Sequence, residues 1–354
     1  MTKPTLLALA LASALAAALP SAAAQSSVQF YGAIDAGLRY QTNVDEAGNS
    51  LLSMGSGNYY ANRLGLRALE DLGGGLSARF QLESGFSSKT GALDNTRNTL
   101  FNRTAAVGLG GKWGYVDLGR QYTIGFRTEL FLDPFDHHYT GLVPLSSGSG
   151  TSLPAAAAAS GLSASSSSGT RFNNDIQYSG SFGGLTVRAE YALGEVDGDT
   201  RKGSARAAGF SYTDGTMLAA GAYTRKQTPA GFENEAYIAG GGVKLQDVTI
   251  KAGLSRERQD SAAAGAYRNM TAFGGVSYLV NPFVELTGAL YRSRYEGAGN
   301  SGTRTLALLG ASYTLSRRTN LYAEIDANTY RGALIPASRQ TRQHGVSAGV
   351  MHRF

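Results

Sequence analysis

Charged side chains recur at every second residue of several segments, a spacing that suits the handling of ions in water rather than bond-making chemistry. These charged positions are Arg39, Arg79, Glu83, Arg188, Glu190 and Glu285. Because side chains alternate sides along a β-strand, the charges share one face of each strand. A packed interior does not hold charges at alternate positions, whereas the wall of a water-filled lumen does. Rings of arginine in such a lumen select for anions, and rings of carboxylates select for cations.

Motifs that would indicate catalysis or metal binding lack the partners that their chemistry needs. Residues 345–349 match the G-x-S-x-G pattern of a nucleophile elbow, but no helix follows them, as that motif requires. His137 and His138 are adjacent, the chain has only two other histidines and no cysteine, and a zinc site is therefore not expected. The sequence predicts a protein without metal, cofactor or enzymatic activity.

The N-terminus reads as a secretory signal over residues 1–24. Lys3 supplies a positive start, Leu6–Leu19 is apolar, and Ala22–Ala24 forms a small-residue cleavage site. We expect the mature chain to begin at Gln25. The formal net charge of +6 is modest and does not by itself predict a nucleic-acid partner. The absence of cysteine rules out a disulfide framework and fits export to an oxidising compartment.

The elements that must position these charges are β-strands with one apolar and one polar face. Residues 28–40 are apolar at every even position, from Val28 to Tyr40, while Asp35 and Arg39 fall on the other face. The same alternation recurs in residues 76–82, 185–191 and 284–290. A period of two is the signature of half-buried strands. The sequence predicts an all-β fold.

Short and long connections alternate along the whole chain. Counting the strands between them gives about sixteen, with both chain ends on the side of the short turns. An even strand number of that kind predicts a closed, transmembrane antiparallel β-barrel, in which no sheet edge is left unpaired in lipid. A soluble sandwich is the alternative, and strict alternation over the whole chain argues against it. We expect no helix outside residues 1–24.

One connection is far longer than the others and spans about 121–170. Its first half is aromatic and acidic, and its second half, about 145–169, consists mostly of Ser, Ala and Gly. Insertions of this length in a compact domain are usually functional or disordered. We expect this loop to fold into the lumen of the barrel that residues 25–354 build.

Several stretches together resemble the general porins of the Gram-negative outer membrane. They are SSVQFYGAIDAGLRY (26–40), NRLGLRALEDLGGGLSARFQLESGF (62–86), FNRTAAVGLGGKWGYVDLGRQYT (101–123), RFNNDIQY (171–178) and GVMHRF (349–354). The resemblance covers nearly the whole mature chain. It implies a trimer of sixteen-stranded barrels, each with its third external loop folded inward to narrow the pore.

The resemblance also implies a basic wall that faces an acidic loop across the narrowest point of the pore. The wall arginines at matching positions are Arg63, Arg103 and Arg171, and two further arginines on the lumen-facing side are Arg39 and Arg79. The carboxylates available in the loop are Glu129, Asp133 and Asp136, and the sequence does not select among them. Such a constriction predicts passive diffusion of small hydrophilic solutes and ions, with a mild preference for anions.

The implied partners are outer-membrane lipid and lipopolysaccharide, further copies of the chain in a homotrimer, and the barrel-assembly machinery. The machinery would read the C-terminal strand, which ends in Phe354. A solute-specific porin is the nearest alternative, and an aromatic ladder along the pore would favour it. Two alternatives come from other classes of protein. One is an outer-membrane enzyme, for which Ser347 and His344 are the nearest candidates for a catalytic set. The other is an adhesin whose external loops bind a partner.

Overall fold

The computed structural model describes residues 27–95, 98–138, 170–261, 265–297 and 299–354. The expected signal at residues 1–24, the expected start at Gln25 and the Ser/Ala-rich half of the long loop lie outside the described residues. No helix within the described ranges is long and apolar enough to cross a membrane.

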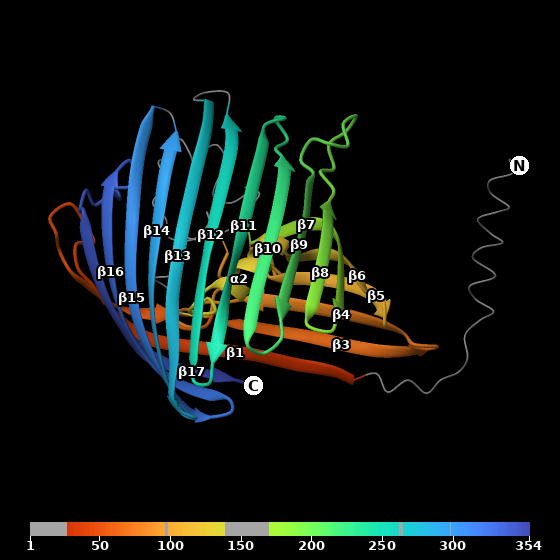
Figure 1. The fold of residues 1–354 in the computed structure, drawn as a ribbon, viewed down its shortest axis with the longest axis horizontal. Coiled ribbons are helices and arrows are strands. Elements are labelled where there is room, and N and C mark those ends of the chain that lie inside the picture. The colour runs from red at the N-terminus through yellow and green to blue at the C-terminus, as the bar shows by residue number, and fades with distance from the viewer. Residues whose placement is uncertain (1–26, 96–97, 139–169, 262–264, 298) are drawn as a thin grey trace, which may run out of the picture.

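The described chain is almost entirely β-sheet, with seventeen strands and one short helix, α2 (Figure 1). The elements are β1 (Ser27–Gln41), β2 (Leu51–Ser56), β3 (Arg63–Gly73), β4 (Leu76–Gly85), β5 (Thr104–Gly111), β6 (Gly114–Tyr122), α2 (Ile124–Leu132), β7 (Arg171–Phe182), β8 (Leu185–Ala192), β9 (Ala205–Thr213), β10 (Met217–Gln227), β11 (Glu233–Leu245), β12 (Val248–Ser261), β13 (Gly265–Asn281), β14 (Val284–Gly297), β15 (Asn300–Ser316), β16 (Thr319–Gly332) and β17 (Arg342–Arg353).

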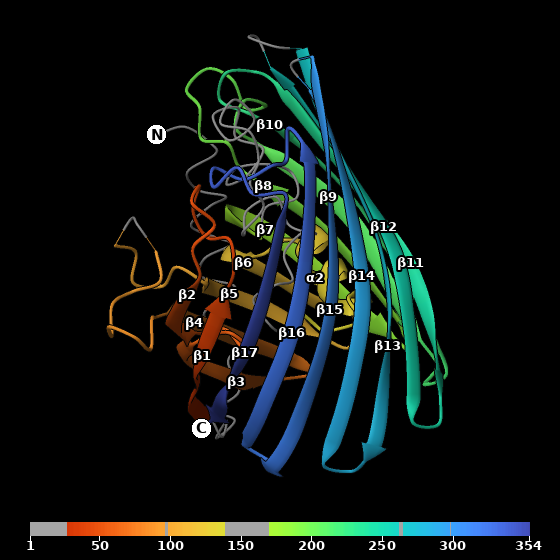
Figure 2. The same cartoon turned by 90° about the vertical axis from the view of Figure 1, so that its left-hand side faces the viewer.

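The sheet closes on itself and forms the predicted barrel (Figures 1 and 2). Each strand from β3 to β17 pairs antiparallel with the next, and β17 returns to β1, with Ala33 opposite Arg353 and Gln41 opposite Gly345. On its other edge, β1 pairs with β2 along one half and with β3 along the other half. Because β2 and β3 share one position in the wall, seventeen strands fill sixteen positions. The predicted strand number is confirmed.

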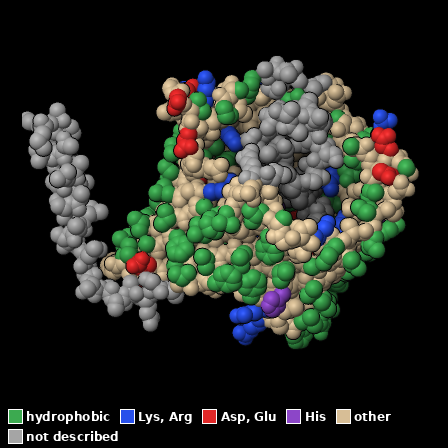
Figure 3. All heavy atoms as spheres, turned by 180° about the vertical axis from the view of Figure 1, so that it is seen from behind, with side chains coloured by type: hydrophobic (Ala, Val, Ile, Leu, Met, Phe, Trp, Pro, Cys, Tyr) green, Lys and Arg blue, Asp and Glu red, His purple; other side chains and the backbone are tan. Residues whose placement is uncertain are grey.

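The two faces of the strands are arranged inside-out, as the alternation predicted. Val28, Phe30 and Leu38 on β1 are 61%, 56% and 59% exposed on the outer wall, whereas Asp35 on the same strand is fully buried inside. In Figure 3, apolar side chains cover the outside of the barrel and basic side chains lie in the hollow. An apolar exterior around a polar lumen is how a barrel sits in a membrane.

The connections are short at one end of the barrel and mostly longer at the other. At the short end, Gly74 and Gly75 turn the chain between β3 and β4 with φ of +62° and +81°, which favours glycine. Two connections at the other end are also short, because β12 and β13 pair as far as Ser261 and Gly265, and β14 and β15 as far as Gly297 and Asn300.

Helix α2 contradicts the expectation that no helix would occur outside residues 1–24. Thr123 caps its start, with Oγ1 accepting the Phe126 N–H at 3.2 Å, and the Asp133 N–H donates to the Glu129 carbonyl at 2.8 Å at its end. Nine residues are too few for a helix to be stable alone. Packing against the inner face of β8 to β12 stabilises it, and this buries Ile124 and Leu132 completely.

Candidate functional site

Three arginines that the sequence proposed for the pore wall lie together, and they are called the arginine cluster below. Arg63 begins β3, Arg103 directly precedes β5, and Arg171 begins β7. Arg103 Nε donates to Glu83 Oε1 at 2.7 Å, and Arg63 Nη1 lies 3.9 Å from Glu83 Oε2. Arg103 Nη2 donates to the Tyr122 hydroxyl at 2.5 Å, and the Arg171 guanidinium lies 4.2 Å from the centre of the same ring. Glu83 and Tyr122 therefore hold the cluster together.

The arginine cluster carries more positive than negative charge. Glu83 pairs with Arg103 and lies 3.9 Å from Arg63, whereas Arg171 makes no ion pair with any described residue, and guanidinium stays charged at any ordinary pH. Arg171 Nε is buried and has no hydrogen-bond partner among the described residues. In a confined space this excess acts on passing ions more strongly than it would in bulk water, because the low-dielectric wall limits screening.

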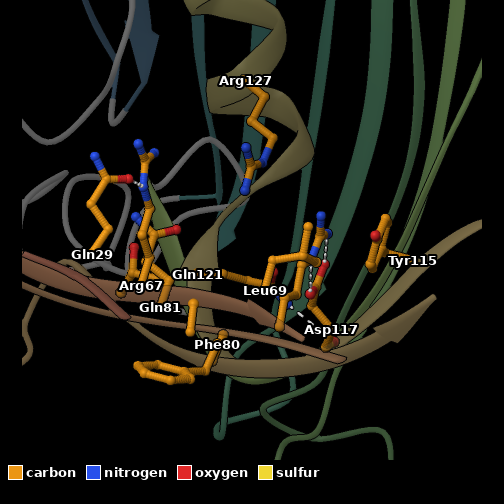
Figure 4. A pocket seen from close by; sticks show the side chains of 13 residues that line it. Gln29, Arg67, Leu69, Phe80, Gln81, Tyr115, Asp117, Gln121 and Arg127 are labelled. Carbon is orange, nitrogen blue, oxygen red and sulfur yellow. Dashed lines mark hydrogen bonds and ion pairs between the residues drawn. The ribbon is translucent and has the colours of Figure 1, made fainter. Parts of the chain in front are cut away.

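Arg127 on α2 adds a fourth cation that the sequence analysis missed. Its guanidinium lies 5.9 Å from the Tyr122 ring, and burial lowers the pKa of Arg127. In Figure 4, the Arg127 side chain extends from α2 toward the strands that carry Asp117 and Gln121. The sequence showed only that an arginine lies in the acidic half of the loop. The orientation of its side chain could not be predicted, because it depends on the helix.

Arg127 also lines a hollow of about 460 Å³ along the same wall (Figure 4). Within this hollow Arg79 makes two hydrogen bonds to Asp117, at 2.8 and 2.5 Å, and Arg67 Nε donates to Gln29 at 2.8 Å. Arg79 was proposed from its position on the strand. Arg67 was missed, although it lies four residues from Arg63 on the same face of β3.

Arg39 lies apart from the cluster, on the part of the wall where β1 meets β17. Its Nη1 donates to Glu324 and its Nη2 to Asp326, both at 2.7 Å, and Nη1 also donates to Ser347 at 2.8 Å. Two carboxylates of β16 thus balance this arginine. The structure does not bring Arg39 to the other proposed wall residues.

Glu129 points toward the strand wall and away from the open lumen. It is 3% exposed on the face of α2 that packs against Ala222, Ile238 and Glu257. Burial, and then the nearby carboxyl groups of Glu257 and Asp133, raise the pKa of Glu129 well above its ordinary value. Of the three carboxylates among which the sequence did not select, Glu129 thus faces the wall, because the helix turns its side chain that way.

Asp133 is also buried, at the end of α2. Its Oδ1 accepts the Tyr291 hydroxyl at 2.5 Å, and its Oδ2 accepts the His137 N–H at 2.7 Å. Burial raises the pKa of Asp133, although these hydrogen bonds oppose the shift. Asp133 therefore also faces the protein, because its carboxylate binds Tyr291 and the turn that follows the helix.

Asp136 is the one of the three proposed loop carboxylates whose side chain opens to solvent, at 64% exposed. The residue adopts a left-handed conformation with φ of 51°, which turns its carboxylate outward from the loop. Lys251 Nζ on β12 lies 2.5 Å from Asp136 Oδ1 and also donates to the Asp133 carbonyl at 3.0 Å. The carboxylate is therefore already balanced by a cation of the wall.

The described end of the loop rests on a platform built around Asp35, which the sequence analysis had only placed on the polar face of β1. The Asp35 carboxylate accepts backbone N–H groups from Asn58, Tyr59 and Tyr60 at 3.0–3.1 Å, and the Tyr322 hydroxyl at 2.9 Å. These bonds hold the turn between β2 and β3 inside the barrel. The Tyr59 ring lies 5.1 Å from that of Tyr322 and 4.3 Å from that of His138.

The residues that came nearest to a catalytic set do not converge. Ser347 is buried on the inner face of β17 and donates to Glu324, whereas His344, three residues earlier on the same strand, is exposed on the outer face. Within the described ranges, no group of histidine, aspartate and glutamate side chains has the arrangement of a metal site.

A closed β-barrel with an apolar exterior and a charged lumen, crossed by an inserted loop, defines a membrane channel of the outer-membrane type. The model of the Gram-negative porin family matches residues 8–333, and the chain belongs to that family. The protein is thus an outer-membrane porin.

Known proteins of this kind resemble the chain over nearly its whole length. An outer membrane porin protein of Bordetella pertussis is 29% identical over 413 aligned residues, covering 99% of this chain and all of the relative. Among solved structures, an anion-selective porin from Comamonas acidovorans superposes with a TM-score of 0.75 at 24% identity, covering 93% of this chain and all of that one. The trimer form of OmpT from Vibrio cholerae gives a TM-score of 0.66 at 15% identity, covering 93% and 99%.

Proposed function

We propose that this porin is a non-enzymatic, passive diffusion channel with a mild preference for anions. The observation that carries the proposal is the arginine cluster, in which three guanidinium groups lie together and Glu83 is near only two of them, Arg63 and Arg103. Positive rings in a narrow aqueous passage favour anions over cations. The cluster forms the basic wall of the constriction, with Arg79 and Arg127 beside it in the same part of the lumen.

The loop presents less negative charge to the pore than three free carboxylates would. Glu129 and Asp133 are buried, and Asp136 is paired with Lys251. The raised pKa values of Glu129 and Asp133 favour their neutral forms. Asp136 is therefore the carboxylate that we assign to the acidic side. The fold of an anion-selective porin from Comamonas acidovorans is consistent with the same preference here.

Single-channel recording in a planar bilayer under a salt gradient tests the proposal. The unmodified protein should give a reversal potential of anion sign. The double variant Arg63→Ser with Arg103→Ser should move the reversal potential toward the cation side, because two of the three cluster charges are removed. Arg206→Ser, an exposed arginine on the outer face of β9, is the matched control and should leave selectivity unchanged. A reversal potential of cation sign for the unmodified protein would refute the anion preference.

A specific observation also supports the alternative of a solute-specific porin. Arginine guanidinium groups lie 3.8–5.0 Å from tyrosine ring centres along the wall, in the pairs Arg63–Tyr60, Arg67–Tyr31, Arg79–Tyr115 and Arg171–Tyr122. Stacking fixes guanidinium groups in orientations that suit bidentate recognition of carboxylate. Block of the chloride current that saturates with the concentration of a small carboxylate would favour this alternative. Block that rises linearly with that concentration would exclude it.

We propose further that residues 1–24 are a cleaved signal and that the mature chain starts at Gln25. We also propose that the protein works as a homotrimer and that the barrel-assembly machinery inserts it. The trimer form solved for OmpT of Vibrio cholerae supports the oligomeric part. The C-terminal strand ending in Phe354 supports the assembly part. Cross-linking of purified protein in detergent tests the trimer, and N-terminal sequencing of protein from membranes tests the cleavage site.

A further inference from the structure

The first residue of α2 is attached to the inner wall of the barrel by a buried carboxylate on β8. The backbone N–H of Ile124 donates to both oxygens of Glu190, at 3.2 and 3.3 Å. Glu190 and Ile124 are both buried. The first N–H groups of a helix have no partner within the helix, and a carboxylate is a favourable acceptor for them. Glu190 therefore fixes the start of α2 to the wall.

A second wall residue, Gln177 on β7, attaches the chain just before the helix. Gln177 lies directly opposite Glu190 in the sheet and is also buried. Its Nε2 donates to Glu190 Oε2 at 2.8 Å and to the backbone carbonyl of Tyr122 at 3.0 Å. A side-chain amide has two N–H groups, so it can supply one to each acceptor. Gln177 and Glu190, called the wall pair below, thus hold the backbone on both sides of Thr123, where β6 ends and α2 begins.

The shape of the wall allows α2 to lie unusually close to it. A Cβ at Gly209 on β9 would lie 2.6 Å from Ile124 Cγ2, and one at Gly240 on β11 would lie 3.1 Å from Leu132 Cδ2. Both distances are shorter than the ~3.5–4.0 Å of an ordinary carbon–carbon contact. Glycine at these two positions therefore leaves the space that the two ends of the helix fill, and the helix has little room to move while the wall pair holds its start.

The backbone that the wall pair holds connects two side chains of the basic wall. Tyr122, on one side of Thr123, contacts Arg103 through its hydroxyl and Arg171 through its ring. Arg127, on the other side, extends from α2 into the hollow of about 460 Å³ (Figure 4). A displacement of this backbone would therefore move Tyr122 and Arg127 together and would change where the guanidinium groups lie.

The contacts of Glu190 indicate a role in position more than a role in the charge of the lumen. The side chain is buried, and both of its oxygens accept hydrogen bonds from the protein. Glu83 differs, because its carboxylate contacts the guanidinium groups of Arg103 and Arg63 directly. A neutral side chain that accepts the same hydrogen bonds should therefore replace Glu190 but should not replace Glu83.

We infer that Gln177 and Glu190 are positioning residues of the channel, which hold Tyr122 and α2 against the wall and thereby set the places of Arg127, Arg103 and Arg171. They act through hydrogen bonds to the backbone and do not touch the permeating ion. For its effect on ion preference the inference rests on the proposed function. The attachment of the helix can be measured without reference to that preference.

The first test measures how often the start of α2 leaves the wall. The chain has no cysteine, so the single substitution Ile124→Cys introduces one thiol at a buried position and keeps the backbone N–H that Glu190 accepts. Purified, folded porin in detergent is treated with methyl methanethiosulfonate, and mass spectrometry gives the rate of labelling. This reagent is uncharged, so neither the charge at position 190 nor the ion preference of the pore affects its access.

In the Ile124→Cys background, Glu190→Ala should speed labelling about tenfold or more, because the helix loses the acceptor of its first N–H. Glu190→Gln keeps a carbonyl oxygen at the same place and should label within about twofold of the background. Gln177→Leu should also speed labelling, and it provides the test if Glu190→Ala does not fold. Glu235→Ala, on the outer face of β11, is the matched control and should leave the rate unchanged. Heat-modifiable migration on gels establishes that each variant is folded.

The second test is the reversal potential under a salt gradient, measured on the same variants without the introduced thiol. Glu190→Ala should reduce the anion preference, whereas Glu190→Gln should leave it near that of the unmodified protein. Unchanged labelling in both Glu190→Ala and Gln177→Leu would overturn the inference. An equal shift of the reversal potential in Glu190→Ala and Glu190→Gln would also overturn it, because Glu190 would then act through its charge. An unmodified pore without anion preference would refute the proposed function and would leave the labelling result standing.

Discussion

Glu83 sets how much positive charge the arginine cluster presents to the lumen. The residue is 2% exposed on β4, where it accepts hydrogen bonds from Arg103 and from Tyr31 Oη at 2.9 Å and lies 3.9 Å from Arg63. Removing a buried partner of this kind leaves its cations unbalanced. Under the proposed function, Glu83 thus offsets part of the positive charge of the arginine cluster through its contacts with Arg103 and Arg63.

The variant Glu83→Gln keeps the size and hydrogen-bonding capacity of the side chain but removes its charge. We expect the reversal potential in a salt gradient to shift further toward the anion side. The shift should shrink at high salt, since the screening length falls from ~10 Å at 0.1 M to ~3 Å at 1 M. Glu235→Gln, on the outer face of β11, is the control. A shift toward the cation side would contradict the assignment of Glu83.

At the scale of elements, α2 is held in the barrel by groups that are neutral when the loop is docked. Burial lowers the pKa of His138 to about 4, and it also raises the pKa of Glu129 well above its ordinary value. His138 stacks on Tyr59 at one end of the segment, and Glu129 faces Glu257 at the other. The stabilisation that the docked loop gains from His138 should therefore be lost as pH falls, and that from Glu129 should be lost as pH rises.

On the acid side, the undocked loop binds a proton at His138 more readily than the docked loop does. The contribution of His138 to docking is fully present above the ordinary histidine pKa of about 6.5 and is lost as pH falls toward about 4. Fluctuations of the open-channel current should increase over this interval. His138→Phe keeps a ring against Tyr59 and should remove the increase. Identical acid behaviour of the variant and the unmodified protein would refute the role of His138.

On the alkaline side, the sign is reversed because the docked state favours the protonated carboxyl of Glu129. The contribution of Glu129 to docking is fully present below the ordinary glutamate pKa and is lost as pH rises through the raised value. Glu129→Gln removes the ionisation, so current fluctuations in alkaline solution should decrease relative to the unmodified protein. The exposed Glu46→Gln is the control. No difference between Glu129→Gln and the unmodified protein at any pH would contradict this account.

At the scale of the whole molecule, the barrel depends on the contact between its two ends. The backbone of Phe354 exchanges two hydrogen bonds with Gly32, both at 3.1 Å, and its ring lies 5.7 Å from that of Phe30. A Cβ at position 32 would collide with the Phe354 ring, so glycine leaves the space that the last residue fills. The same residue can thus close the barrel and present the proposed assembly signal.

The variant Phe354→Ala separates these two roles. We expect a several-fold loss of folded barrel in cells, measured as heat-modifiable protein in outer membranes. Refolding of the purified variant into lipid vesicles, without the assembly machinery, should proceed nearly as for the unmodified chain, because the backbone hydrogen bonds to Gly32 remain. An equal loss in both experiments would assign Phe354 to barrel closure alone.

The periodicity of two made the barrel predictable from the sequence, because each strand has to present one face to lipid and one to water. The arginine cluster was predicted from the resemblance to the general porins, whereas the periodicity pointed to Arg39 and Arg79. The loop was not predictable. Helix α2 is apolar on several sides and has no clear helical period, and its packing decides that Glu129 and Asp133 point into the wall while Arg127 points along it.

The shared position of β2 and β3 implies an order of events during biogenesis. The turn between these strands carries Tyr59, which Asp35 of β1 holds in place and which stacks on Tyr322 of β16. The platform for His138 is therefore complete only after the first and last strands have met. A newly inserted barrel should therefore close first, with an unconstricted pore. Its selectivity for solute size should develop last, when the loop docks.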